Sequence, residues 1–216
     1  EKVKYFYKKK EESLSTGTCL ILITPDAERT MVTFLGIAGK VGEKDIDEKA
    51  VKESEMIFLE GYLWDKGEPK SAFDKAMSFS KKKVMSLSDQ FCVERHKVDF
   101  LDLVKNKLDI TFANEQEIKS LIDTNNFDEV ISFGKQLGKI LIITRGEKGS
   151  IAIQNGEVVE CDVKSNLKIV DLTGAGDLFA AGFLHAFINN FSTRESLETG
   201  TDMSSKIIQK VGARLS

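Results

Sequence analysis

The sequence predicts an α/β protein whose mostly parallel central sheet is covered by helices on both faces and carries antiparallel strands at one edge. Short runs rich in β-branched residues alternate with amphipathic segments of helical length, which is the pattern of a parallel sheet. Two further β-rich runs flank Asn155-Gly156, a dipeptide typical of the turn between antiparallel strands. With 216 residues the chain is long enough for one large domain with a single core.

The expected elements follow one another in a regular order. The first is a hairpin, in which β-rich runs at 16–24 and 30–36 are joined by the polar turn PDAER. Strands are then expected at 56–61, 83–89, 110–114, 139–144, 150–154, 157–163 and 168–170. Helices are expected at about 69–82, 96–107, 115–123, 127–138, 176–190 and 193–211.

The composition favours work on small molecules. The formal charge is −3, from 31 basic and 34 acidic residues that are interspersed, so no basic field for nucleic acid is present. No apolar run reaches the length that spans a bilayer. The cysteines Cys19, Cys92 and Cys161 are odd in number and lack zinc-site spacing, which indicates reduced thiols in a cytoplasmic protein. The sequence begins without Met, so we expect the native chain to start upstream.

The most informative stretch is KIVDLTGAGDLFAAGFLHAFINN, residues 168–190. Gly174 and Gly176 let the backbone turn so that successive N–H groups point outward at the start of a helix, where the helix dipole adds positive charge. This arrangement makes an anion hole, and Asp177 beside it is placed to accept a proton from an attacking hydroxyl. The alternative is a tight turn in which Asp177 is an ordinary N-terminal cap.

Other polar residues follow the expected strands, where ligands of open α/β sheets bind. Asn114 and Glu117 follow one strand, and Thr144 begins the turn Thr144-Arg145-Gly146 after another. Together with TGAGDLFAAGF, these elements resemble the ribokinase-like (pfkB-type) family of carbohydrate and nucleoside kinases. They match the family's N-x-x-E and T-x-G elements, and Gly212-Ala213 matches the usual end of its last helix. The resemblance extends along essentially the whole chain.

The resemblance implies a ribokinase-like fold and an ATP-dependent, Mg²⁺-requiring kinase acting on a primary hydroxyl of a sugar or nucleoside. Asp177 would be the base, and the backbone of residues 173–176, which includes Gly174, Ala175 and Gly176, would stabilise the transferred phosphoryl group. The remaining ATP-binding positions would be Asn114, Thr144, Gly146, Gly149 and Thr173.

The resemblance also implies metal positions. Asn114 and Glu117 would organise Mg²⁺ through water, because Mg²⁺ usually keeps several waters. Asp171 and Thr173 lie where some members hold an activating monovalent cation, such as K⁺.

The chain departs from the family pattern at its beginning. Members run to about 300 residues, more than a typical single domain, and they start with a segment that holds most of the lid and of the acceptor site. We therefore expect residues 1–216 to form a single ribokinase-like domain that lacks its N-terminal segment, with the hairpin at 16–36 contributing to the lid. Core strands left without neighbours would expose edges that can pair with another chain, so a homodimer is an open expectation.

Three functional interpretations remain. The stretches TGTCLILIT, EGYLWD and SDQFCVERH resemble the bacterial branch of adenosine and sugar kinases, so adenosine is the favoured acceptor. The second interpretation is a catalytically incomplete remnant that binds nucleotide without an acceptor. The third, a nicotinamide-dependent oxidoreductase, is disfavoured because no strand leads into a GxGxxG sequence. The stretch GIAGKVG at 36–42 lacks Walker A spacing, and we expect it to be a loop.

Overall fold

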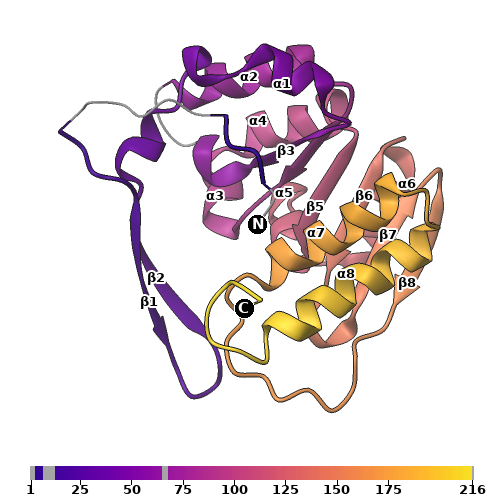
Figure 1. Ribbon diagram of the computed structural model, residues 1–216. Coiled ribbons are helices and arrows are strands. Elements are labelled where there is room, and N and C mark those ends of the chain that lie inside the picture. Colours follow the sequence, from indigo (N-terminus) through magenta and orange to yellow (C-terminus); the bar gives the residue numbers. More distant parts are fainter. Residues whose placement is uncertain (1–2, 7–12, 65–67, 216) are drawn as a thin grey trace. The chain divides into compact units, whose positions relative to one another are not determined.

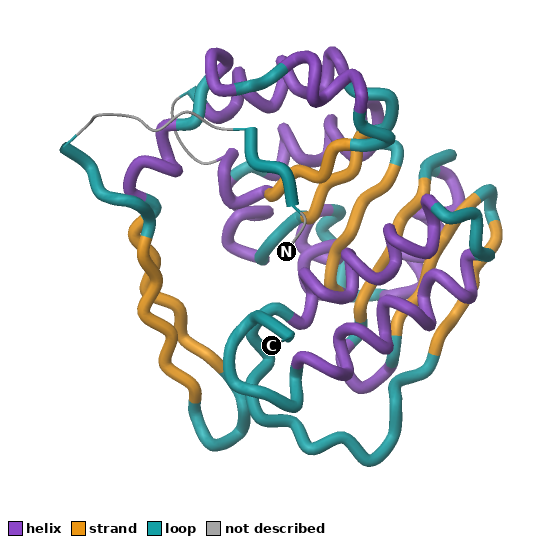
Figure 2. The backbone as a smooth tube through the Cα atoms, in the orientation of Figure 1, coloured by secondary structure: helices purple, strands orange, loops and turns teal. Residues whose placement is uncertain are grey.

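A computed structural model describes residues 3–6, 13–64 and 68–215 (Figure 1). The chain divides into two compact units, the first drawn from residues 1–19 and 33–111 and the second from residues 20–32 and 112–216. The strands are β1 (Thr18–Ile23), β2 (Arg29–Phe34), β3 (Ile57–Glu60), β4 (Lys83–Ser86), β5 (Ile110–Asn114), β6 (Ile140–Thr144), β7 (Ser150–Gln154) and β8 (Glu157–Cys161). β1 and β2 form a two-stranded sheet, and the others form a sheet in the order β3-β4-β5-β6-β7-β8. Figure 2 shows the strands in orange.

The helices alternate with these strands. The α-helices are α1 (Glu48–Glu53), α2 (Pro69–Phe79), α3 (Gln90–Arg95), α4 (Lys97–Asp102), α5 (Glu115–Leu121), α6 (Phe127–Gln136), α7 (Ala175–Ile188) and α8 (Thr193–Ile207). α4 continues as a π-helical turn, Leu103–Lys107, and short 3₁₀-helices occur at Gly36–Lys40, Glu43–Asp45, Gly61–Trp64 and Gly146–Lys148. Among the described residues, every helix is too short or too polar to span a lipid bilayer.

In the first unit, β3 and β4 pair in parallel from Ile57 opposite Lys83 to Glu60 opposite Ser86. Phe100 of α4 is fully buried, and its ring lies 3.2 Å from the Cβ position of Gly61, the residue after β3. Trp64 packs its edge against Phe100 and donates its indole N–H to Asp99 Oδ2 at 3.0 Å. Trp64 is therefore a core residue with a satisfied polar group.

In the second unit, β7 pairs antiparallel with β6 and with β8, which confirms the predicted antiparallel edge. Cys161 lies opposite Ser150 and its sulfur contacts Thr201 Oγ1 of α8, so this face of β7 and β8 lies under α8. Ile153 points to the other face, where its side chain meets Gly134 of α6. Helices thus cover β7 on both faces, which explains why residues 150–153 are all buried.

The helices α7 and α8 lie side by side (Figure 1), and glycines set how closely they approach. A Cβ on Gly182 would lie 2.7 Å from the Thr199 carbonyl oxygen and 3.0 Å from the Gly200 Cα. A Cβ on Gly200 would lie 2.8 Å from the Phe179 carbonyl oxygen. The backbones of the two helices are therefore in direct contact where they cross.

Most of the predicted elements are confirmed, but some expectations were wrong. Residues 168–170 form no strand; instead the N–H groups of Val170 and Asp171 donate to the Ile208 carbonyl oxygen just after α8. α8 ends at Ile207, so Gly212-Ala213 follows the helix and does not close it. The stretch at 36–42, expected as a loop, begins with the 3₁₀-helix Gly36–Lys40.

Candidate active site

The first turn of α7 is entered through a glycine in the left-handed conformation. Gly174 is the N-cap residue, with φ of 79°, a conformation that side chains rarely adopt. A Cβ at this position would also lie 3.0 Å from the Ala213 Cβ and 3.2 Å from the Ala213 Cα. Both the backbone conformation and the close approach of Ala213 explain why the sequence has glycine here.

The amides of this turn are only partly used inside the protein. The N–H of Thr173 donates to Asp171 Oδ1 at 2.8 Å, and the N–H of Ala175 donates to the Leu172 carbonyl oxygen at 3.2 Å. Within the described residues, the N–H groups of Gly174, Gly176 and Asp177 have no acceptor. Three donors therefore remain available at the positive end of a helix of 14 residues, an arrangement suited to an anion.

Asp177 is exposed and is not the cap of this helix. The N-cap is Gly174, and no side chain caps α7, so the alternative of Asp177 as an ordinary N-terminal cap is wrong. Its carboxylate has no hydrogen-bond partner in the described part of the chain. The first turn of α7 thus presents a free carboxylate next to three free amides.

Asp171 anchors the segment that leads into this turn. Its side chain is only 1% exposed. Its Oδ1 accepts hydrogen bonds from the N–H of Thr173 at 2.8 Å and from the Thr173 hydroxyl at 2.6 Å, and its Oδ2 accepts from the N–H of Gly212 at 2.8 Å. Burial by itself raises the pKa of Asp171, but the hydrogen bonds from Thr173 and Gly212 outweigh it, so the pKa lies below the ordinary 3.8.

Replacing Asp171 with Asn tests this anchor. Asn has one uncharged acceptor oxygen, so it cannot accept the hydrogen bonds from both Thr173 and Gly212. We therefore expect Asp171→Asn to lower the free energy of unfolding by about 2 kcal/mol. Because the folded-state pKa is depressed, the stabilisation is present above the unfolded-state pKa and is lost as the pH falls through the folded-state value. Urea unfolding from pH 7 to pH 2 should show the variant's deficit shrinking below about pH 4. A deficit that does not change with pH would contradict the ionised anchor.

Asn114 and Glu117 are held together at the end of β5. Asn114 is the N-cap of α5, and its Oδ1 accepts from the N–H of Glu117 at 2.8 Å. In return, Glu117 Oε2 accepts from the N–H of Asn114 at 2.9 Å and Oε1 accepts from Asn114 Nδ2 at 2.6 Å. This capping box fixes the buried Glu117 carboxylate beside the exposed Asn114.

The turn after β6 contains the other predicted nucleotide-binding residues. Thr144 is half-buried at the strand end, opposite Ser150 of β7. Gly146 is exposed, with open space where a side chain would project. Gly149 is buried, has φ of 81°, and a Cβ there would lie 2.1 Å from the Cys161 carbonyl oxygen. Gly149 therefore has a packing reason to be glycine, besides its expected role in the ATP channel.

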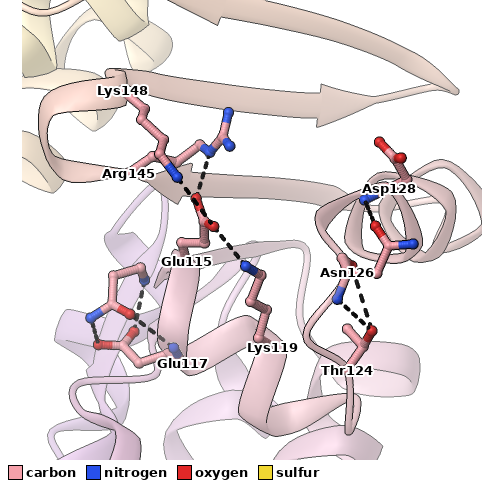
Figure 3. Close-up of polar contacts among 9 residues, drawn as sticks. Glu115, Glu117, Lys119, Thr124, Asn126, Asp128, Arg145 and Lys148 are labelled. Carbon is pink, nitrogen blue, oxygen red and sulfur yellow. Dashed lines mark hydrogen bonds and ion pairs between the residues drawn. The ribbon is translucent and has the colours of Figure 1, made fainter.

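Side chains link two of these groups. Glu115, the residue after Asn114, accepts a hydrogen bond from Arg145 Nε at 2.8 Å, which joins the start of α5 to the turn after β6 (Figure 3). Asp171, Thr173 and the first turn of α7 form the remaining group.

Comparison with known proteins identifies the family. The model of the pfkB family of carbohydrate kinases matches residues 1–216. The chain belongs to the pfkB family. This result confirms the resemblance on which the sequence-based expectations depended, and the solved structures of similar proteins confirm the ribokinase-like fold.

Several known proteins are similar to this pfkB-family chain along nearly its whole length. An adenosine kinase from Dictyostelium discoideum is 31% identical over 226 residues, which is 94% of this chain and 65% of the relative. The crystal structure of adenosine kinase from Sinorhizobium meliloti superposes with a TM-score of 0.90 at 35% identity, covering 93% of this chain and 63% of that one. A probable sugar kinase from Rhizobium etli gives a TM-score of 0.92 at 34% identity, covering 95% and 64%. The chain thus spans just under two thirds of the length of these relatives.

Two features of this pfkB-family site escaped the sequence analysis. One is the N–H of Gly212, which binds Asp171 across 41 positions of sequence. The other is the contact between Glu115 and Arg145, 30 positions apart. Opposite charges placed just after two neighbouring strands were a signal for the second contact, whereas a backbone amide leaves no signal in a sequence.

Proposed function

We propose that the intact protein is an ATP-dependent kinase that transfers a phosphoryl group to a primary hydroxyl of a sugar or nucleoside, with adenosine favoured. The observation that carries this proposal is the first turn of α7, where the free N–H groups of Gly174, Gly176 and Asp177 adjoin the free carboxylate of Asp177. Membership of the pfkB family supports it.

The residues of this turn have complementary tasks. ATP, when bound, would supply its γ-phosphoryl group, and ADP would leave as the bond to the β-phosphate oxygen breaks. The amides of Gly174, Gly176 and Asp177 stabilise the negative charge that accumulates on the oxygens of the phosphoryl group during transfer. Asp177 accepts the proton of the acceptor hydroxyl as its oxygen attacks. The N–H groups of Thr173 and Ala175 donate to acceptors inside the protein. These two amides therefore hold the conformation of the turn and do not donate to phosphate.

The residues that would serve nucleotide and metal are of suitable chemistry. In the described part of the chain, no three His, Cys, Asp or Glu side chains gather to form a metal cage. This fits a Mg²⁺ ion held by phosphates and waters, with Asn114 and Glu117 acting through water. Both Glu117 oxygens accept hydrogen bonds from Asn114, and a carboxylate oxygen can accept more than one hydrogen bond.

The remaining binding positions are proposed on the same basis. Thr144, Gly146 and Gly149 would line the nucleotide channel, and the open space beside Gly146 supports access there. Asp171 and Thr173 would hold a monovalent cation such as K⁺, which suits the ionised state of the Asp171 carboxylate.

The nature of the acceptor rests on the relatives. Two of the relatives described above are called adenosine kinases and one is called a probable sugar kinase. We propose adenosine first and a sugar second. The hairpin at 16–36 would contribute to a lid over the acceptor, which is supported by the exposed apolar side chains of Leu20, Leu22 and Val32. A homodimer and a cytoplasmic location remain predictions.

The proposal predicts acceptor-dependent consumption of ATP. The intact protein should convert ATP to ADP in the presence of adenosine and Mg²⁺, at a rate that exceeds the rate without acceptor by at least about a hundredfold. A coupled ADP assay with adenosine, inosine, ribose and fructose would rank the acceptors. ATP binding by calorimetry without ADP release for any of the four would support the catalytically incomplete remnant instead.

A further inference from the structure

A cluster of charged side chains surrounds Glu115, the first residue of α5 (Figure 3). Its carboxylate is 17% exposed and lies 2.8 Å from Arg145 Nε, 2.7 Å from Lys119 Nζ and 3.9 Å from Lys148 Nζ. Burial raises the pKa of Glu115, but the hydrogen bonds from Lys119 and Arg145 outweigh this effect and leave the pKa below its ordinary value. Glu115 is therefore ionised at neutral pH and is surrounded by cations.

These cations differ in what they connect. Lys119 is on the same helix as Glu115, four residues further on, so its contact stays within α5. Lys148 has a side chain that is 68% exposed, and its distance to Glu115 is the longest. Arg145 comes from the turn after β6, and its side chain is only 19% exposed. Of the three cations, Arg145 is therefore the one that links two elements through a largely buried side chain.

Arg145 is held by a second contact and in turn holds the backbone. The carbon at the centre of its guanidinium group lies 3.7 Å from the ring centroid of Phe127, the first residue of α6. Its N–H donates to the Gly149 carbonyl oxygen at 2.8 Å, and its carbonyl oxygen accepts from the N–H of Lys148 at 3.1 Å. Fixing the Arg145 side chain therefore fixes both ends of the turn at 144–149.

A planar guanidinium suits this place better than an ammonium group. Arg can lie flat on an aromatic ring while its Nε–H donates in the plane to a carboxylate, and Lys cannot do both with one point charge. Within the turn, the N–H of Gly149 donates to the Gly146 carbonyl oxygen at 3.1 Å, but this bond is local and does not reach α5. The β6–β7 pairing holds the two ends of this turn, and the contact of Arg145 with Glu115 links the turn to the start of α5.

We propose that Arg145, clamped between Glu115 and Phe127, is a positioning residue that sets the turn at 144–149 against the Asn114 end of β5 and so determines nucleotide affinity. The inference rests on the proposed function, because it assigns the turn to nucleotide binding. Arg145 and Glu115 act through the backbone and not on the reacting atoms. Their loss should therefore change the apparent affinity for ATP and leave the chemical step largely intact.

Steady-state kinetics on the intact protein provides the first test. Glu115→Gln and Arg145→Lys should each raise the KM for ATP roughly tenfold, the equivalent of one ordinary ion-paired hydrogen bond, while kcat stays within about threefold. The double variant should raise KM no more than either single variant, because both remove the same link. Lys119→Gln is the matched control. It removes a cation from the same carboxylate without cutting the link between elements, so it should leave KM within about twofold.

Hydrogen exchange provides a second readout that does not need catalysis. In Glu115→Gln and Arg145→Lys, the N–H groups of Arg145 and Gly149 should exchange roughly tenfold faster, and in Lys119→Gln they should not. If wild-type protein neither binds nor consumes ATP, the proposed function fails, and exchange alone then decides whether the clamp holds the turn. The inference would be overturned if exchange of these N–H groups were unchanged in Glu115→Gln and Arg145→Lys. It would also be overturned if exchange were faster but the KM for ATP of the active variants were unchanged.

Discussion

Asp177→Asn is expected to lower kcat by two to four orders of magnitude while ATP binds with nearly its normal affinity. Asn has the shape of Asp but does not accept a proton at neutral pH, and loss of a general base typically costs this much. The side chain is exposed and has no hydrogen-bond partner among the described residues, so the fold should tolerate the change. The turnover number from an ADP-release assay and the ATP affinity from calorimetry would measure the two effects separately.

The control for this prediction is another exposed carboxylate in the same pair of helices. Glu198→Gln in α8 removes the same charge away from the first turn of α7 and should keep kcat within about twofold. Thermal unfolding should place both variants within about 0.5 kcal/mol of wild type, the typical contribution of a charge near a helix end. Near-normal turnover by Asp177→Asn would remove Asp177 from the mechanism.

Gly149→Ala is expected to cause the largest loss of stability among single-methyl additions at the candidate site. The added carbon would lie 2.1 Å from the Cys161 carbonyl oxygen and would have to adopt φ of 81°. Strain in the left-handed region costs about 1–2 kcal/mol, and overpacking against the backbone adds about 1–3 kcal/mol. Together these effects, about 2–5 kcal/mol, should lower the melting temperature by roughly 4–20 °C for a chain of this size.

Gly156→Ala separates the two contributions to that loss. Gly156 has φ of 79°, close to that of Gly149, but no atom lies within 4 Å of its Cβ position. The substitution should therefore show only the backbone strain, with a melting temperature roughly 2–8 °C below that of wild type. The melting temperatures would be measured by calorimetry. If both variants melted at the same temperature, the strand pair β7–β8 would accommodate the added methyl group, contrary to the close packing described.

The fold was largely readable from the sequence because its strands and helices have strong local patterns. Asn155-Gly156 predicted the β7–β8 hairpin, which the structure confirms. The run at 168–170 has the same β-branched character, yet Ile169 is 48% exposed and the nearby N–H groups bind the end of α8. A strand needs a neighbouring strand, and composition alone does not supply one. The six-residue helices α1 and α3 are too short to show a helical period.

The candidate site was predictable where neighbouring residues in the sequence form it. Gly174, Gly176 and Asp177 are adjacent, so the free amides and the carboxylate could be inferred from the glycines and the helix that follows. The sequence could not show that the N–H groups of Thr173 and Ala175 donate to acceptors inside the protein, because those hydrogen bonds depend on the loop's conformation. The opposite charges of Glu115 and Arg145 were a signal for the clamp between them only if β5 and β6 are neighbours in the sheet, and a single sequence does not reveal that order.

The crossing of α7 and α8 has a consequence for the energetics of ligand capture. Gly182 and Gly200 bring the two backbones into contact, so α7 cannot tilt or slide without a collision of main-chain atoms. The first turn of α7 belongs to this tightly packed pair of helices, so little conformational entropy is left there for a bound ligand to remove.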